Sequence, residues 1–524
     1  MAEAATSLPE VEAGAGAELE AEAGAGGLFR RIDARLDPDP ARVVSRLFVP
    51  GEELMTGRPR VDGVVKRVLA LSEADVTVMA RQIRDRFSGR HPDLDGLLSE
   101  HAMIASVHLH DAGRISRDRA VVLGATLTSE YAVEGAALCN PSAMLHPDQR
   151  ALAPGQARLA VSLRAIGEGH LSSIGFCEAV VGPGPSWAFS ERPLPVVAGV
   201  PAPTTFQREN LRAILQDSNE IDEFVLSVLD ALPPVFDSHV LENILDEVPV
   251  PLISRQTGKG SKDRLRHIVS SVCRTSFAPD AELGQQVLMP TNAEERLGLE
   301  DARFVLFRED DGTTCYLATY TAWDGEQIAP RVFVSADLRV FEMYRPAGPA
   351  AHNKGMALFP RRVGGRFVAL CRPDGETNGV AFSDDGRVWG DPIVIAPPSL
   401  SWELMQVGNC GSPIETPQGW LVLTHGVGPM RVYSIGALLL DLEDPTRVIA
   451  RLAEPLITPT DGHGDGYVPN VVYSCGGVVH DGVVWLPYAV GDSRIEVGWV
   501  TLDDLLDAMT PEPVHAVLAG GQRS

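Results

Sequence analysis

"DARFVLFREDDGTTCYLATYTAWDGEQIAPRVFVSADL", residues 301–338, contains three apolar runs separated by turn residues. Each run has the length of a β-strand, and Gly312 and Gly325 mark the turns between them. Polar residues such as Asp301 and Arg331 stand where the runs begin. The segment is therefore predicted to form an antiparallel three-stranded unit with polar groups at its strand ends.

Four other segments repeat this pattern, which makes five copies in all. They cover residues 140–181, 354–389, 410–445 and 469–505. A spacing of roughly 40–60 residues between similar β units is typical of a propeller. The repeats predict a mainly β fold, a five-bladed β-propeller; a β-sandwich with coincidental spacing is the alternative.

Two other stretches, residues 60–130 and 208–248, carry apolar residues at helical spacing. We expect an N-terminal α-helical region over 29–132, and a helical insertion after the first blade at about 205–255. The insertion interrupts a propeller catalytic domain predicted over 133–510. Residues 1–28 are expected to form a disordered acidic tail, and 511–524 a C-terminal tail.

The composition excludes several classes of partner. A formal net charge of −25 argues against nucleic acid and against an anionic membrane surface. Seven scattered cysteines without a CxxC pair predict reduced thiols in a cytoplasmic protein, and no metal site. We find no signal peptide and no apolar run of transmembrane length.

Aligning the five copies brings distant residues to one rim, because equivalent strand ends of a propeller meet at one face. The first strands are preceded by Asn140, Asp301, Lys354, Asn409 and Asn470. The second strands are followed by Arg164, Asp324, Arg372, His425 and Asp492. The third strands are preceded by His170, Arg331, Asn378, Tyr433 and Arg494.

Asp301 would therefore face a group of positive and hydroxyl side chains, which is suited to holding an anion. The group comprises Arg331, Lys354, Arg372, His425 and Tyr433. The alternative is that these residues form ordinary salt bridges between loops. Glu300 precedes Asp301, so on a regular strand the two side chains would leave by opposite faces and only one could enter the cavity.

From about residue 133 to 508 the chain resembles glycoside hydrolase family 130, inverting β-mannoside phosphorylases and hydrolases on a five-bladed propeller. The matching motifs are "GLEDARF" (298–304), "NKGMALFP" (353–360), "CRPDG" (371–375), "GNCGSPIETPQGWLVLTHGVGPMRVYSIGALLLDLEDP" (408–445) and "GYVPNVVYSCGGV" (466–478). The helical N-terminal region resembles that of the longer members of the family.

The resemblance implies roles for individual residues. It implies that Asp301 is the general acid. The positions that match or adjoin phosphate-binding residues are Arg331, Lys354, Arg372, His425 and Tyr433. We expect substrate contacts from Asn140, Arg164, Asn470 and Asp492. The chain departs from several phosphorylases of the family at Gln406, where they have a further lysine.

Inverting hydrolysis needs a second carboxylate to activate water, whereas phosphate is already a nucleophile and needs only to be held in line. The nearby carboxylates Glu403 and Glu415 have the sequence context of structural residues. We therefore predict inverting phosphorolysis of β-linked manno-oligosaccharides, of β-1,2 linkage, to α-mannose 1-phosphate. Inorganic phosphate is the co-substrate and no cofactor is expected.

Two other functions stay open at this point. One is an inverting β-mannoside hydrolase on the same scaffold, and the other is a non-catalytic glycan-binding propeller. A homo-oligomer is also left open.

Overall fold

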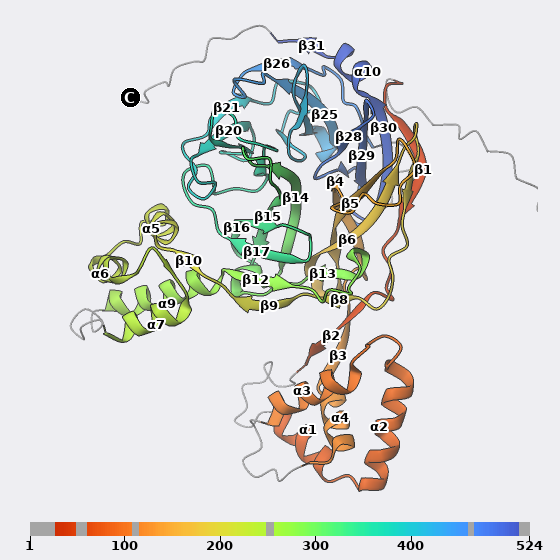
Figure 1. Cartoon of the computed structure of the whole chain (residues 1–524), viewed down its shortest axis with the longest axis vertical. Coiled ribbons are helices and arrows are strands. Elements are labelled where there is room, and N and C mark those ends of the chain that lie inside the picture. Colours follow the sequence, from red (N-terminus) through yellow and green to blue (C-terminus); the bar gives the residue numbers. More distant parts are fainter. Residues whose placement is uncertain (1–26, 49–59, 107–114, 248–255, 460–465, 513–524) are drawn as a thin grey trace, which may run out of the picture.

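The computed structural model of the chain describes residues 27–48, 60–106, 115–247, 256–459 and 466–512. The predicted tails lie outside these ranges except for residues 27–28 and 511–512. The described part is mainly β, with two groups of helices and a short helix near residue 505 (Figure 1). This confirms the mainly β class and the presence of helices.

The five repeats form five antiparallel units. Unit 1 contains β4 (Ala137–Leu145), β5 (Ala157–Ile166), β6 (Ser172–Val181) and β7 (Trp187–Phe189). Unit 2 contains β14 (Gly298–Arg308), β15 (Thr314–Trp323), β16 (Ile328–Ser335) and β17 (Val340–Tyr344). Unit 3 contains β18 (Ala357–Leu358), β19 (Phe367–Cys371), β20 (Asn378–Ser383) and β21 (Ile393–Ala396).

In each of the last two units, two short strands pair with the same long strand. Unit 4 contains β22 (Gln406–Asn409), β23 (Ile414–Thr416), β24 (Gly419–Val427), β25 (Tyr433–Leu440) and β26 (Val448–Arg451). Unit 5 contains β27 (Val472–Tyr473), β28 (Val478–His480), β29 (Val483–Val490) and β30 (Arg494–Thr501). The short strands β22 and β23 pair with β24, and β27 and β28 pair with β29. The short helix α10 (Leu502–Asp507) and β31 (Thr510–Pro511) follow, and β31 pairs with β26.

Each unit contacts the next, and the last contacts the first. The contacts join β4 to β14, β15 to β18, β19 to β22, β25 to β27, and β29 back to β4. A cavity of about 430 Å³ is lined by residues from all five units, among them Met144, Phe304, Pro360, Ile414 and Val478. No sheet closes on itself within the described ranges, and the five-bladed propeller stays a prediction at this point.

Unit 5 obtains its outermost strand from the other end of the chain. Strand β1 (Arg30–Leu36) pairs antiparallel with β30. The prediction assigned these residues to a helical region, but the structure shows a strand. Its partner is distant in the sequence, so no local periodicity could reveal the pairing. Phe29, just before β1, is 1% exposed and packs edge-on against Tyr488.

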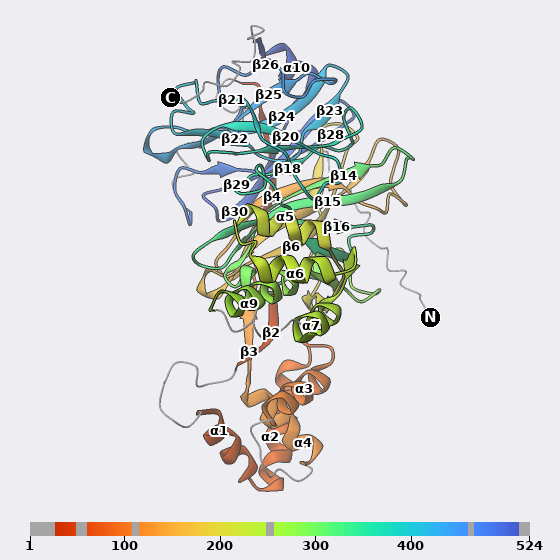
Figure 2. The same ribbon diagram turned by 90° about the vertical axis from the view of Figure 1, so that its left-hand side faces the viewer.

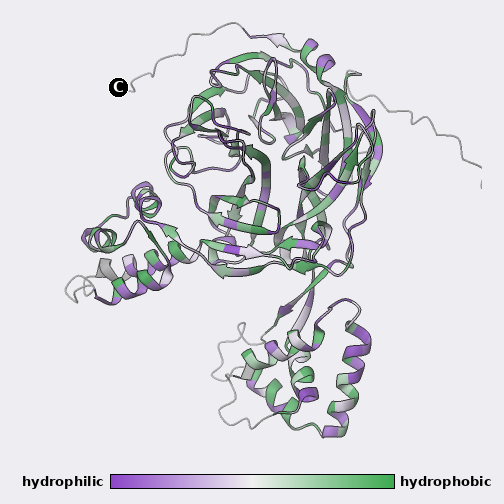
Figure 3. Ribbon diagram, viewed as in Figure 1, coloured by the Kyte–Doolittle hydropathy of each residue, from purple (hydrophilic) through white to green (hydrophobic). Residues whose placement is uncertain are grey.

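The N-terminal helical region contains α1 (Arg60–Leu69), α2 (Glu73–Phe87), α3 (Leu94–Ser106) and α4 (Arg117–Thr126). Strands β2 (Val43–Leu47) and β3 (Thr128–Ala132) pair and connect it to the β units (Figure 2). Helices α3 and α4 approach so closely that a Cβ on Gly124 would lie 1.9 Å from the Leu98 carbonyl oxygen. Both hydrophobic and hydrophilic residues lie on these helices (Figure 3), and hydrophobic residues of all four form one buried core.

The helical insertion between units 1 and 2 contains α5 (Arg208–Asp217), α6 (Glu223–Ala231), α7 (Ser238–Glu247) and α9 (Gln256–Ser270). It therefore continues about one helix beyond the predicted end at residue 255. Short strands flank it: β8 (Val197–Ala198), β9 (Val200–Pro203), β10 (Phe206–Gln207), β11 (Val235–Phe236), β12 (Cys273–Ser276) and β13 (Gln286–Leu288). Since β12 pairs with both β9 and β17, the insertion is anchored on unit 2.

All seven cysteines are free, as the sequence predicts. Within the described part of the chain, no helix is long and apolar enough to cross a membrane.

Replacing Phe29 by alanine tests the contribution of β1. Phe29→Ala removes a buried aromatic ring from the core shared with unit 5, so the free energy of unfolding should fall by about 3–5 kcal/mol. Urea unfolding measures it. The control Phe48→Ala removes a ring that is 56% exposed and should change stability by less than about 0.5 kcal/mol. Equal effects of the two substitutions would contradict a structural role for β1.

Candidate active site

Glu300 and Asp301 reach the same arginine, contrary to the prediction that they face opposite sides. Arg164 donates from one Nη to Glu300 Oε1 at 2.6 Å and from the other to Asp301 Oδ1 at 3.3 Å. The cause lies in the backbone, because Asp301 has a left-handed φ of 56° and β14 contains a bulge between Glu300 and Arg303. A bulge re-aims side chains and breaks the strict alternation of a strand.

The same backbone conformation recurs at equivalent positions of other units. Asn140 in unit 1 has a φ of 50° and Asn470 before β27 has a φ of 63°. Asp and Asn adopt this region more readily than most residues. The side-chain amide of Asn140 donates from Nδ2 to Asp301 Oδ1. The three repeats thus share this backbone conformation, and in units 1 and 2 it accompanies a polar side chain that reaches the neighbouring unit.

Arg303 is 2% exposed and binds the backbone of Asp301. Its guanidinium donates to the Asp301 carbonyl at 2.8 Å, to the Cys410 carbonyl at 2.9 Å and to the Tyr473 hydroxyl at 3.0 Å. One buried cation therefore connects units 2, 4 and 5. Arg303 and Tyr473 were not among the residues predicted from the sequence, because the repeat alignment selects strand ends and both side chains are buried.

Lys354 donates from Nζ to Glu300 Oε2 at 2.8 Å. With Arg164 on the other oxygen, Glu300 bridges unit 1 to the segment that leads into unit 3. Glu300 therefore pairs with cations of neighbouring units and not with Arg303. Both carboxylate oxygens of Glu300 carry a cationic partner, so this residue is a poor candidate for a catalytic base.

Arg372, His425 and Tyr433 lie together beside this group. A Cβ on Gly408 would lie 2.9 Å from Arg372 Nε and 2.6 Å from His425 Cε1, so only glycine leaves room for both. The rings of His425 and Tyr433 stack with centroids 6.4 Å apart, and Tyr473 lies 4.9 Å from His425. Arg372 Nε and His425 Nδ1 are buried and have no partner within the described ranges.

The electrostatics of the site follow from burial and from these cations. Burial raises the pKa of Asp301, but Arg164, Arg303 and Lys354 together outweigh it and the net pKa lies below the usual value. Burial, with Arg372 and Arg303 nearby, holds the pKa of His425 well below its usual range, so its imidazole is neutral at pH 7. Asp492 differs, because burial raises its pKa to about 6 against the attraction of Arg164.

The structure does not bring Arg331 into this group. Its side chain is fully buried, pairs with Glu294 and donates to the Ser271 carbonyl at 3.3 Å. Arg331 is opposite Tyr320 in the sheet, and the Tyr320 hydroxyl bonds to Glu295 rather than to the Asp301 group. Its placement at the rim is therefore wrong in this structure, because the alignment fixed its position along the strand but not its face.

Three other residues named in the sequence analysis lie outside the Asp301 group or contribute only backbone to the site. Asn470 contributes its backbone carbonyl, which accepts from Tyr433 N at 3.0 Å. Glu403 and Glu415 lie in structural ion pairs, as predicted: Glu403 with Arg451 at 2.9 Å and Glu415 with Arg361 at 2.8 Å.

The chain matches known proteins over its β part. The profile of glycoside hydrolase family 130, described as beta-1,4-mannooligosaccharide phosphorylase, matches residues 281–511. A 1,2-beta-oligomannan phosphorylase from Thermoanaerobacter sp. (strain X514) is 37% identical over 229 residues, which is 43% of this chain and 75% of that protein. A beta-1,2-mannobiose phosphorylase from the same organism is 35% identical over 215 residues, 40% of this chain and 69% of that protein.

Among solved structures, the beta-1,2-mannobiose phosphorylase from Listeria innocua in complex with beta-1,2-mannobiose is 21% identical. The alignment covers 72% of this chain and 92% of that one, with a TM-score of 0.41.

The raised pKa of Asp492 gives a pH-dependent prediction. A carboxyl whose pKa rises from 3.8 to about 6 on folding stabilises the folded chain below pH 4, and this contribution is lost as the pH rises through 6. Asp492→Asn should therefore raise the free energy of unfolding by about 1–3 kcal/mol at pH 8 and leave it unchanged at pH 4.

Urea unfolding at the two pH values checks this. The control is Asp481→Asn, at an exposed aspartate with a similar φ of 48°, and it should change stability by less than about 0.5 kcal/mol at both. A loss of stability in Asp492→Asn at pH 8 would show that the carboxylate is stabilising there.

Proposed function

This chain belongs to glycoside hydrolase family 130 and is a glycoside phosphorylase; we propose that its reaction is the inverting phosphorolysis of β-linked manno-oligosaccharides to α-mannose 1-phosphate. The observation that carries this proposal is the acid candidate Asp301 beside a group of cationic and hydroxyl side chains, several of which have no carboxylate partner within the described ranges. Lys354 and Arg164 share Glu300, while Arg372, His425 and Tyr433 form no ion pair within the described ranges.

In the proposed reaction, Asp301 protonates the departing glycosidic oxygen, directly or through a hydroxyl of the bound mannose. Arg372, His425 and Tyr433, with Lys354, hold phosphate on the opposite face of the sugar ring, in line with the bond that breaks. Arg303 is too buried to meet substrate and serves to position Asp301 and Tyr473. Arg331 is left out of the phosphate site, because its guanidinium is buried against Glu294.

The pKa of Asp301 is low in the free site, and substrate binding should raise it. Phosphate brings negative charge close to the cations that depress this pKa, and a nearby negative charge disfavours ionisation of a carboxyl. The bound sugar also removes water from the site, which acts in the same direction. Phosphate binding would thus prepare Asp301 to act as an acid.

The hydrolytic alternative needs a carboxylate base on the far face of the sugar. Glu300, Glu403 and Glu415 are all engaged in ion pairs. The carboxyl of Asp492 has a pKa of about 6 and would be the base under this alternative. Under phosphorolysis we propose that Asp492 contacts a sugar hydroxyl, with Asn140, Arg164 and Asn470.

Several further points belong to the proposal. The β-1,2 linkage is supported by the names of two of the relatives. The five units are proposed to be blades of one propeller, in support of which each contacts the next in a ring and all five line one cavity. The catalytic domain is proposed to cover residues 133–510 together with β1, which pairs with β30, and the rest of the N-terminal region to 132 is proposed as a separate helical domain. We also propose that the enzyme needs no cofactor and is cytoplasmic.

The phosphate requirement tests this function. The enzyme is incubated with β-1,2-mannobiose or β-1,4-mannobiose, with inorganic phosphate or with sulfate at equal ionic strength, and products are followed by NMR. We expect α-mannose 1-phosphate from the β-1,2 disaccharide only when phosphate is present. Release of free mannose at the same rate in both buffers would favour the hydrolase, and no product in either would favour a binding protein.

A further inference from the structure

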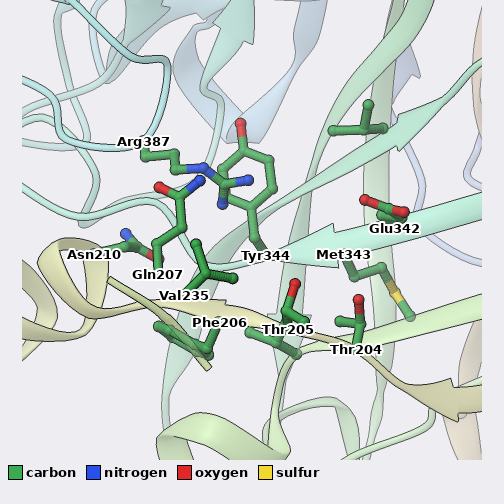
Figure 4. Close-up of a pocket in the computed structure, with 12 residues that line it drawn as sticks. Thr204, Thr205, Phe206, Gln207, Asn210, Val235, Glu342, Met343, Tyr344 and Arg387 are labelled. Carbon is green, nitrogen blue, oxygen red and sulfur yellow. The ribbon is translucent and has the colours of Figure 1, made fainter. Parts of the chain in front are cut away.

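We propose that a small cavity between the helical insertion and units 2 and 3 is a second binding site for a tetrahedral oxyanion such as inorganic phosphate (Figure 4). The cavity is separate from the Asp301 group. The segment 204–210 that leads into α5 forms one wall, β17 of unit 2 forms another, and Arg387 of unit 3 closes it.

An unpartnered amide points to a ligand. Asn210 is 3% exposed, lines the cavity, and its Nδ2 has no hydrogen-bond partner. A buried donor without a partner costs about 1–3 kcal/mol, so it is normally satisfied by protein, water or ligand. An oxyanion accepts such a bond without needing to donate one.

The start of α5 adds a second donor surface. The helix has ten residues, and its N-cap residue Gln207 makes no side-chain capping bond. Arg208 N donates to the Pro234 carbonyl at 3.0 Å, but the helix dipole still makes this N-terminus favourable for negative charge. Asn210 lies in the first turn of this helix, so its amide and the helix N-terminus face the same cavity.

Arg387 supplies the charge. Its guanidinium lies over the Tyr344 ring at 4.2 Å, which fixes its plane, and it forms no ion pair within the described part of the chain. In Figure 4, Arg387, Gln207 and Asn210 gather at one end of the cavity, whereas the carboxylate of Glu342 lies at the other. An anion would therefore occupy the donor end and be repelled from the Glu342 end.

The size of the cavity selects among ligands. Its volume is about 100 Å³. That is enough for a few water molecules or one small ligand, and it is below the roughly 300–1,000 Å³ of sites for larger organic ligands. A bare oxyanion with five non-hydrogen atoms therefore suits this space better than a sugar phosphate.

The position suggests an effect on the active site. Ala347 donates to the Arg387 carbonyl and accepts from Trp389 N, each at 2.8 Å, and Gly348 N donates to Asp217 at the end of α5. The chain at residues 347–348, shortly before Lys354, is therefore bonded both to unit 3, through residues 387 and 389, and to the end of α5, through Asp217. An anion here would brace the insertion against units 2 and 3 and steady the approach to Lys354.

Equilibrium dialysis of the full chain against labelled inorganic phosphate tests the site. We expect two phosphates per wild-type chain, and one in each of the variants Arg387→Gln and Gln207→Glu, with at least about a tenfold loss of affinity at this site. Gln207 is exposed, so its isosteric replacement should not impair folding. The control is Arg366→Gln, at another arginine of unit 3 whose guanidinium stacks on an aromatic ring; this variant should still bind two phosphates.

The counts separate this inference from the proposed function. If the Asp301 site does not bind phosphate, the wild type should bind one and both variants none, and the inference stands. If both variants bind as many phosphates as the wild type, the inference is overturned. Mannose 1-phosphate should compete for the active site alone; its competition at both sites would overturn the assignment to a bare oxyanion.

Discussion

The left-handed backbone of Asp301 is the constraint on which the site depends. On a regular strand Glu300 and Asp301 would diverge, but the bulge in β14 lets both reach Arg164. Glu300 is then held by Arg164 and Lys354, which leaves Asp301 as the acid candidate. A conformation that costs free energy persists where the surrounding contacts determine it, and the buried Arg303 provides such contacts.

The cations around Asp301 act in two ways. They depress the pKa of the acid in the free site, which by itself hinders proton transfer, and they attract the anion that relieves this depression. Because the imidazole of His425 is neutral, it adds a hydrogen-bonding group without further charge. The same physical chemistry recurs at the second cavity, where Arg387, the Asn210 amide and a helix N-terminus present donors without a paired carboxylate.

The sequence predicted the five β units and most residues around Asp301, and each wrong or missing prediction has a physical reason. The repeat pattern located the strands of five units and the positions of Asn140, Arg164 and Lys354 beside Asp301. It misplaced Arg331, because an alignment of strands does not determine which face a side chain takes. It missed β1, whose partner β30 lies at the other end of the chain. It could not foresee that a bulge would turn two adjacent carboxylates to one arginine.

The most direct test of Asp301 as the acid is the turnover of Asp301→Asn on two substrates at saturating phosphate. A general acid matters when the departing oxygen is basic and hardly matters when the leaving group is already stable as an anion. If Asp301 protonates the glycosidic oxygen, kcat on β-1,2-mannobiose should fall by about a hundredfold to ten-thousandfold, while kcat on a dinitrophenyl β-mannoside falls by less than about tenfold. An equal fall on both substrates, or no fall on the disaccharide, would contradict that role.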